Sequence, residues 1–338
     1  MSRKCESAAA GAGVQEEARP RALRKRKAQQ EDRPTWPCSG LDRASFIALV
    51  RERGIELYRD LPWRHIDDAY AVLVSEVMLQ QTQVKRVERF WRRFLEAFPT
   101  IDALAAASTS DVLELWQGLG YNRRALALKK TADVCSAEFG GKLPRGYDDL
   151  VALPGIGPAT AAGVRAFAFE EPGVYLETNV RAVFLHDVFP DCDKVSDREL
   201  APLVADVCPA APTGSGSADV ARASAAERDP LASPRDWYYA LLDYGAHLKA
   251  TGVNPTRRSA HYTRQSAFEG SRRQKRSWIV RRVLVEPDGV KVSQVLVELN
   301  RAEEKAGRSA VDDSEFRSII VDLAGEGFFR MEGDVLVP

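Results

Sequence analysis

Apolar residues recur every three or four positions along most of this chain, which is the spacing of helices with one buried face. No alternation of the kind that marks a half-buried strand occurs between Leu41 and Val204. The pattern predicts helices at residues 70–84, 87–97, 111–116, 123–138 and 237–248. We therefore expect a core that is mainly α-helical.

The pattern changes near the C-terminus. Residues 271–338 indicate a helix, a short strand, two helices and two more short strands, with strand candidates at 283–285, 328–330 and 335–337. Helix pairs followed by a small hairpin favour a winged-helix-like α+β module, and a generic small α+β domain is the alternative. Residues 209–235 are rich in Pro, Ser and Ala and predict a flexible insertion within a core that spans residues 41–270.

Residues 1–40 contain few large apolar side chains and a basic run, Arg19 to Lys27, so we expect a disordered basic arm. The chain of 338 residues has 48 basic and 48 acidic side chains, and a formal charge of zero excludes a uniformly basic, histone-like protein. No apolar run approaches the ~20 residues of a membrane span, and the N-terminus has no apolar signal segment. We expect a cytoplasmic protein.

Five cysteines are scattered through the chain, and no two form a CxxC pair. This spacing argues against a disulfide scaffold, a zinc ribbon and a cysteine-bound iron–sulfur cluster. His247 and His261 lie fourteen positions apart, and a place at the protein surface suits them better than metal ligation. We therefore expect no metal site.

The sharpest local motif is LPGIGPATA at residues 153–161, in which Gly155 and Gly157 flank a single aliphatic residue. Two glycines at this spacing make a tight turn and leave backbone N–H groups unpaired at the start of the next helix. Such a turn binds anions, phosphate above all, without reading base sequence. The motif has the form of a helix-hairpin-helix, and a plain turn between two core helices is the alternative.

Several further motifs occur in a fixed order along residues 61–249. They are LPWR at 61–64, SEVMLQQTQV at 75–84, FPT at 98–100, LWQGLGY at 115–121, the hairpin at 153–161 and Asn179-Val180. Together they resemble the helix-hairpin-helix DNA glycosylases, and the string SEVMLQQTQV resembles the MutY-type adenine glycosylases in particular. The resemblance implies a mainly α, two-lobed helix-hairpin-helix core with the small C-terminal module appended.

Two carboxyl groups are the catalytic candidates. Glu76 lies in a largely apolar helix, where burial raises the pKa of a carboxyl group and keeps it protonated for general acid catalysis. By resemblance Glu76 protonates the flipped base, and Glu177 stabilises the cationic sugar or activates water. An exposed Glu76 on a polar stripe is the alternative.

The resemblance also implies contacts with DNA and a base pocket. Residues expected at DNA are Gln80, Gln81, Thr82, Tyr121, Gly155, Gly157, Thr160, Asn179 and Arg181. Tyr121 corresponds to the family's aromatic wedge, and the 80–82 segment would fill the gap left by the flipped base. Trp63, Arg64 and Asp243 would line the base pocket.

This chain departs from the family pattern at three places. Glu177 stands where the family has aspartate, and Pro158-Ala159 replaces the hairpin lysine that forms a Schiff base in lyase relatives. No cysteine follows Asp243, so we expect no 4Fe–4S cluster, its structural role passing to packing of Tyr262 and Phe268. Neighbouring basic residues would then supply positive charge for phosphates. We expect no cofactor, and a monovalent cation at the hairpin is the alternative.

We therefore predict a monofunctional DNA glycosylase of base excision repair. It is expected to be a monomer that binds double-stranded DNA containing a mismatch or lesion, with no membrane partner. Adenine opposite 8-oxoguanine or guanine is the default substrate. Two alternatives remain. One is a glycosylase for another base, such as uracil, thymine or hypoxanthine, and the other is a catalytically silent lesion-sensing protein.

Overall fold

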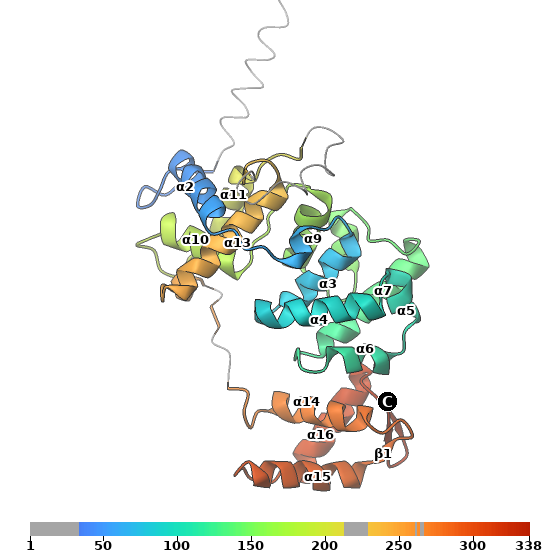
Figure 1. The fold of residues 1–338 in the computed structure, drawn as a ribbon. Helices are drawn as coiled ribbons and strands as arrows, with labels where there is room; N and C mark the ends of the chain where they lie inside the picture. The colour runs from blue at the N-terminus through green and yellow to red at the C-terminus, as the bar shows by residue number, and fades with distance from the viewer. Residues whose placement is uncertain (1–33, 213–228, 261, 264–266) are drawn as a thin grey trace, which may run out of the picture.

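The structure, a computed structural model, describes residues 34–212, 229–260, 262–263 and 267–338. Figure 1 shows two helical lobes with a smaller module packed beneath one of them. Most of the predicted basic arm and residues 213–228 of the predicted insertion lie outside the described residues. The prediction of a mainly helical core is confirmed.

The first lobe surrounds an apolar core built from aromatic and aliphatic side chains, among them Phe94, Leu104 and Trp116. Its helices are α3 (Ala69–Leu79), α4 (Val84–Ala97), α5 (Ile101–Ala106), α6 (Thr109–Trp116), α7 (Arg123–Glu138), α8 (Tyr147–Ala152) and α9 (Pro158–Phe169). Short polar residues start several of them. Ser108 accepts a hydrogen bond from the Asp111 N–H, a contact of the kind that contributes ~1 kcal/mol to helix stability.

The second lobe combines segments from both ends of the core. Its helices are α2 (Arg43–Glu56), α10 (Thr178–Asp187), α11 (Asp197–Val207) and α13 (Pro234–Ala250), which pack around Phe46, Phe184 and Trp237. Two short 3₁₀ helices follow in the sequence, η1 (Pro62–Arg64) after α2 and η2 (Pro255–Arg258) after α13. Because α2 packs on α13, residues nearly two hundred positions apart share one core.

Helices α3 and α9 pack against each other at the junction of the two lobes. On α9, Val164 belongs to the core of the first lobe, whereas Phe167 belongs to that of the second. Both helices are apolar around most of their circumference, as expected for helices covered on all sides. Any polar side chain on their shared face therefore lies between the lobes.

The C-terminal module has the element order of a winged helix. Its elements are α14 (Arg272–Leu284), β1 (Val290–Lys291), α15 (Val292–Lys305), α16 (Asp313–Glu326), β2 (Arg330–Glu332) and β3 (Val335–Val337), and β3 is the central, antiparallel strand of the sheet. The predicted strand at 283–285 is wrong, because Ile279, Val280 and Val283 continue the buried face of α14. The strand predicted at 328–330 begins two residues later, because the aromatic rings of Phe328 and Phe329 are buried in the core ahead of it.

In the described part of the chain, no helix is both long enough and apolar enough to cross a membrane.

Candidate active site and DNA-binding surface

Glu76 lies on α3, on the face that meets α9. It has room there because residue 163 of α9 is glycine: a Cβ at Gly163 would come within 2.4 Å of Glu76 Oε2. Burial raises the pKa of Glu76 to about 8, although the hydrogen bond from Tyr175 lowers it in part. The carboxyl group is therefore mostly protonated at neutral pH and can donate a proton.

Tyr175 is the direct partner of this carboxyl group. Its phenol donates a hydrogen bond to Glu76 Oε2 at 3.1 Å. The ring is buried between Phe167 and Tyr238, with centroids 5.1 and 5.3 Å away, so its orientation is set by packing. Burial and the two nearby glutamates raise the pKa of Tyr175 well above its ordinary value, which keeps the phenol a donor.

Glu177 is the N-cap of α10. Its Oε1 accepts hydrogen bonds from the backbone N–H groups of Asn179 at 2.5 Å and Val180 at 3.3 Å. The longer side chain thus still reaches the helix start, where the helix dipole favours a negative charge. Burial raises the pKa of Glu177 while the helix N–H groups and Lys249 lower it, and its charge in turn raises the pKa of Glu76.

The hairpin motif connects α8 and α9. Gly155 adopts the left-handed φ of +75°, and a Cβ there would lie 2.5 Å from Ala127 on α7, so the turn requires glycine at this position. The hydroxyl of Thr131 donates to the Pro154 carbonyl at 2.8 Å and holds the turn against α7. Gly157, the N-cap of α9, is exposed with open space around it, as an anion-binding helix start requires.

Three other residues expected at DNA are engaged within the protein. Thr160 is buried, and its hydroxyl accepts a hydrogen bond from Gln80 at 3.1 Å. Asn179 accepts one from Lys249 at 2.7 Å, and Arg181 forms a two-bond ion pair with the Asp197 carboxylate. These contacts favour structural roles for Thr160 and Arg181 over the predicted DNA contacts.

The structure brings Gln80, Gln81, Thr82 and Tyr121 together, because hydrogen bonds from Arg124 join the two loops that carry them. Its guanidinium donates to the carbonyls of Gln80 at 2.6 Å and Gly120 at 3.0 Å, and to the Thr82 hydroxyl at 3.0 Å. One side chain therefore ties the loop after α3 to the loop before α7. Gln81 and Tyr121 have left-handed φ angles of 56° and 52°, an unusual conformation for residues with a side chain.

The three residues expected in the base pocket lie in the protein interior. Arg64 and Asp243 form a buried ion pair with two hydrogen bonds of 2.7 Å, and the guanidinium stacks 4.3 Å from the ring centroid of Tyr239. Trp63 is only 4% exposed and contacts Trp91 edge-on. This geometry favours a structural pairing of η1 with α13, and the base contact stays a prediction.

The stretch where the resemblance places an iron–sulfur cluster does not fit that group. Residues 247–263 contain no cysteine, and within the described ranges no set of three or more metal-ligating side chains converges. Arg258 holds this stretch instead: its guanidinium donates to the Leu185 carbonyl at 2.5 Å, the Phe189 carbonyl at 2.6 Å and the Pro190 carbonyl. Val195 adds two backbone bonds, to Arg258 and Ala260.

The expectation that Tyr262 and Phe268 replace the cluster by packing is wrong, because these side chains are 43% and 47% exposed. The Arg258 side chain, which donates hydrogen bonds to backbone carbonyls, stabilises this stretch instead. For the same reason Arg258 is not available to phosphates. The monovalent cation predicted at the hairpin stays a prediction.

Comparison with known proteins agrees with this geometry. Residues 74–204 match the model of the HhH-GPD superfamily base excision DNA repair proteins. This match covers less than half of the chain, and it confirms the family resemblance inferred from the motifs. The matched stretch contains Glu76, the hairpin, Tyr175 and Glu177, and it excludes the C-terminal module.

The relatives are adenine DNA glycosylases. One from Mycolicibacterium smegmatis is 43% identical over 152 residues, which is 45% of this chain and 52% of that protein. One from Buchnera aphidicola (subspecies Baizongia pistaciae) is 39% identical over 127 residues, 38% of this chain and 36% of that protein. The chain thus spans about half or less of each relative. Among solved structures, a thermostable thymine-DNA glycosylase aligns with a TM-score of 0.47 and 22% identity, covering 60% of this chain and 87% of that one.

Sequence reasoning missed Tyr175, Arg124 and Arg258 as site residues. Tyr175 stands two positions before Glu177, so proximity to a catalytic candidate was a usable signal. Arg124 and Arg258 carry no such signal, because each acts on backbone carbonyls from segments distant in sequence.

Proposed function

We propose that this protein is a monofunctional DNA glycosylase of base excision repair, which hydrolyses the N-glycosidic bond of a mispaired or damaged base in duplex DNA. Adenine opposite 8-oxoguanine or guanine is the default substrate, in keeping with the names of its relatives. The observation that carries the proposal is the pair of partly buried carboxyl groups with raised pKa values, Glu76 on α3 and Glu177 at the start of α10.

The two carboxyl groups suit the two charges that develop in this reaction. Glu76, protonated at neutral pH, donates a proton to the departing base and makes it a better leaving group. Glu177 faces the cationic sugar as a carboxylate and orients the attacking water. The base must first leave the stack, because the glycosidic bond is otherwise inaccessible in the duplex.

Strand cleavage by Schiff-base chemistry is not expected. Pro158 and Ala159 begin α9 directly after Gly157, so the hairpin offers no amine at the position of the lyase lysine. The reaction should therefore stop at an abasic site.

Single-turnover excision on a panel of duplexes tests this proposal. Each duplex carries one A:8-oxoG, A:G, G:U, G:T or hypoxanthine:T pair, and hot alkali converts abasic sites into strand breaks. We expect breaks with A:8-oxoG or A:G, only after alkali, and none with Glu76→Gln. Product from G:U or G:T alone would identify the alternative glycosylase. Tight binding to all duplexes without product would identify a silent lesion-binding protein.

A further inference from the structure

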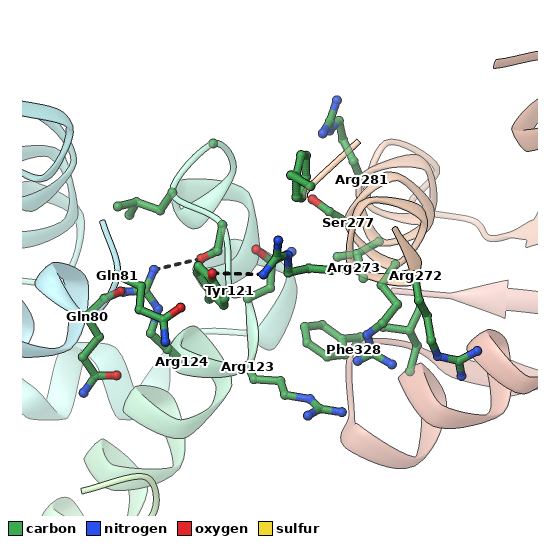
Figure 2. Close-up of a pocket in the computed structure, with 18 of the residues that line it drawn as sticks. Gln80, Gln81, Tyr121, Arg123, Arg124, Arg272, Arg273, Ser277, Arg281 and Phe328 are labelled. Atoms are coloured by element: carbon green, nitrogen blue, oxygen red, sulfur yellow. Dashed lines mark hydrogen bonds between the residues drawn. The ribbon is translucent and has the colours of Figure 1, made fainter. Parts of the chain in front are cut away.

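A cleft of about 1000 Å³ separates the first lobe from the C-terminal module. Gln80, Gln81 and the loop at residues 118–122 form its wall on the lobe, and α14 forms the facing wall. Figure 2 shows Tyr121 between these walls, with side chains of α14 directed toward it. The Arg273 guanidinium donates to the Tyr121 hydroxyl at 3.2 Å and lies 5.5 Å from the ring centroid.

The side chains that line this cleft are strongly basic. Among the described residues that line it, Asp322 is the one acidic residue, set against seven arginines: Arg86, Arg123, Arg124, Arg272, Arg273, Arg276 and Arg281. A surface with this imbalance attracts a polyanion even though the whole chain is neutral.

Not all of these charges are available to a ligand. Arg272 pairs with Asp322, and Arg123 and Arg276 both pair with Glu326. Arg124 is committed to the carbonyls that join the two loops of the lobe. By contrast, Arg86 on α4 and Arg281 on α14 are exposed and form no ion pair with any described residue.

The helix that would read DNA in a winged helix, the third one, is unsuited to it here. Helix α16 carries Asp313, Glu315, Asp322 and Glu326 against a single arginine. Three of these acids accept ion pairs from α14, including Lys275 to Glu315 at 2.8 Å. Helix α16 therefore acts as a counter-charge that fixes α14, and Arg281 on α14 is the exposed basic side chain of the module that lines the cleft, among the described residues.

We propose that the cleft holds the sugar–phosphate backbone of duplex DNA, with Arg86 and Arg281 as phosphate contacts on its two walls. The module thus binds DNA through α14 and not through α16. This inference rests on the proposed function, because Gln80, Gln81 and Tyr121 line the same cleft and are the residues expected to meet the opened duplex. Arg273 connects the two parts, since it belongs to α14 and contacts the expected wedge.

The test compares Arg281→Ala with Arg330→Ala, which removes one exposed arginine from β2 of the same module, outside the lining of the cleft. Affinity for one duplex is measured by fluorescence anisotropy between 0.05 and 0.3 M salt. Loss of one phosphate contact should reduce the slope of log K against log salt by about 0.9 and weaken binding roughly five- to tenfold at 0.1 M salt. Arg330→Ala should match the wild type.

Excision by the wild type on the same duplex separates this inference from the proposed function. If the wild type excises a base while Arg281→Ala binds like Arg330→Ala, the cleft proposal is overturned and the glycosylase proposal stands. If no duplex is processed but the salt slope falls in Arg281→Ala, the cleft binds DNA and the glycosylase proposal fails. An Arg281→Ala effect confined to single-stranded RNA in a parallel titration would also overturn the assignment to duplex DNA.

Discussion

The Tyr175 phenol and the Glu76 carboxyl group, ninety-nine residues apart in the chain, form a hydrogen bond of 3.1 Å at the junction of the two lobes. The contact depends on Gly163, because a side chain there would collide with both partners. Tyr175 therefore supplies a phenol to the proposed acid from the segment that leads into Glu177, and it acts as a positioning residue.

Tyr175→Phe should move the alkaline limb of the pH–rate profile. The phenol lowers the pKa of Glu76, so its loss should raise that pKa above about 8 and extend activity to higher pH. The rate at pH 7 should fall about fivefold, the scale of ~1 kcal/mol for one hydrogen bond. Phenylalanine keeps the contacts with Phe167 and Tyr238. Tyr262→Phe, at an exposed position, is the control, and identical profiles for both variants would refute the role of Tyr175.

Glu76→Gln should abolish excision and leave duplex affinity within a few-fold, because it removes the proton donor and no phosphate contact. It should also change how stability depends on pH. The folded pKa of about 8 exceeds the ordinary 4.5, so the stability contributed by the protonated group is complete below pH 4.5 and is lost as pH rises to 8.

The Glu76→Gln variant has no carboxyl group at this position, so its stability does not fall with pH in this way. Its unfolding free energy relative to the wild type should therefore rise by up to about 1.4 kcal/mol per pH unit over that range. Urea unfolding of both proteins at pH 5 and pH 8.5 measures the difference. Equal pH dependence of the two proteins would contradict a buried, protonated Glu76.

Substitutions at Glu177 distinguish a working carboxylate from a helix cap. Glu177→Gln keeps an oxygen that can accept from the Asn179 N–H, so the protein should fold, but excision should be lost because the amide cannot stabilise the sugar cation. Glu177→Asp should slow single-turnover excision roughly 10- to 100-fold by withdrawing the carboxylate. A faster Asp variant would mean that this pocket is not shaped around the longer side chain, and full activity of the Gln variant would exclude Glu177 from the chemistry.

Purified protein should contain no stoichiometric iron, and Arg258 should stabilise the stretch that follows α13. Arg258→Ala leaves three backbone carbonyls without their charged donor and should lower the unfolding free energy by about 2 kcal/mol. Arg257→Ala, at the exposed neighbouring position, should have little effect. Visible absorbance with four irons per chain would contradict the first expectation. Equal stability of Arg258→Ala and Arg257→Ala would contradict the role of Arg258.

Much of the fold was predictable because helices are local structures. The apolar spacing over residues 123–138 gave the bounds of α7 as observed, since each buried position depends on neighbours three or four residues away. The prediction failed at residues 283–285, where three consecutive apolar residues fit a strand or the end of a helix equally well. Only the packing of Ile279, Val280 and Val283 against the rest of the module decides between them.

The residues of the candidate site also divide into those that the sequence predicts and those that only the structure reveals. The order of the motifs and the resemblance that they carry predicted the hairpin, Glu76 and Glu177 as site residues without a structure, and their roles in catalysis stay predictions. Tertiary structure alone decided that Tyr175 contacts Glu76 and that Arg124 joins two loops that are expected to face DNA. It also placed Arg258 in the stretch where the resemblance implies a metal cluster. It also decided which arginines of α14 form ion pairs with acidic side chains of α16. These contacts join segments far apart in the chain, and no local pattern encodes them, because the partner of a long polar side chain is set by the packing of whole helices.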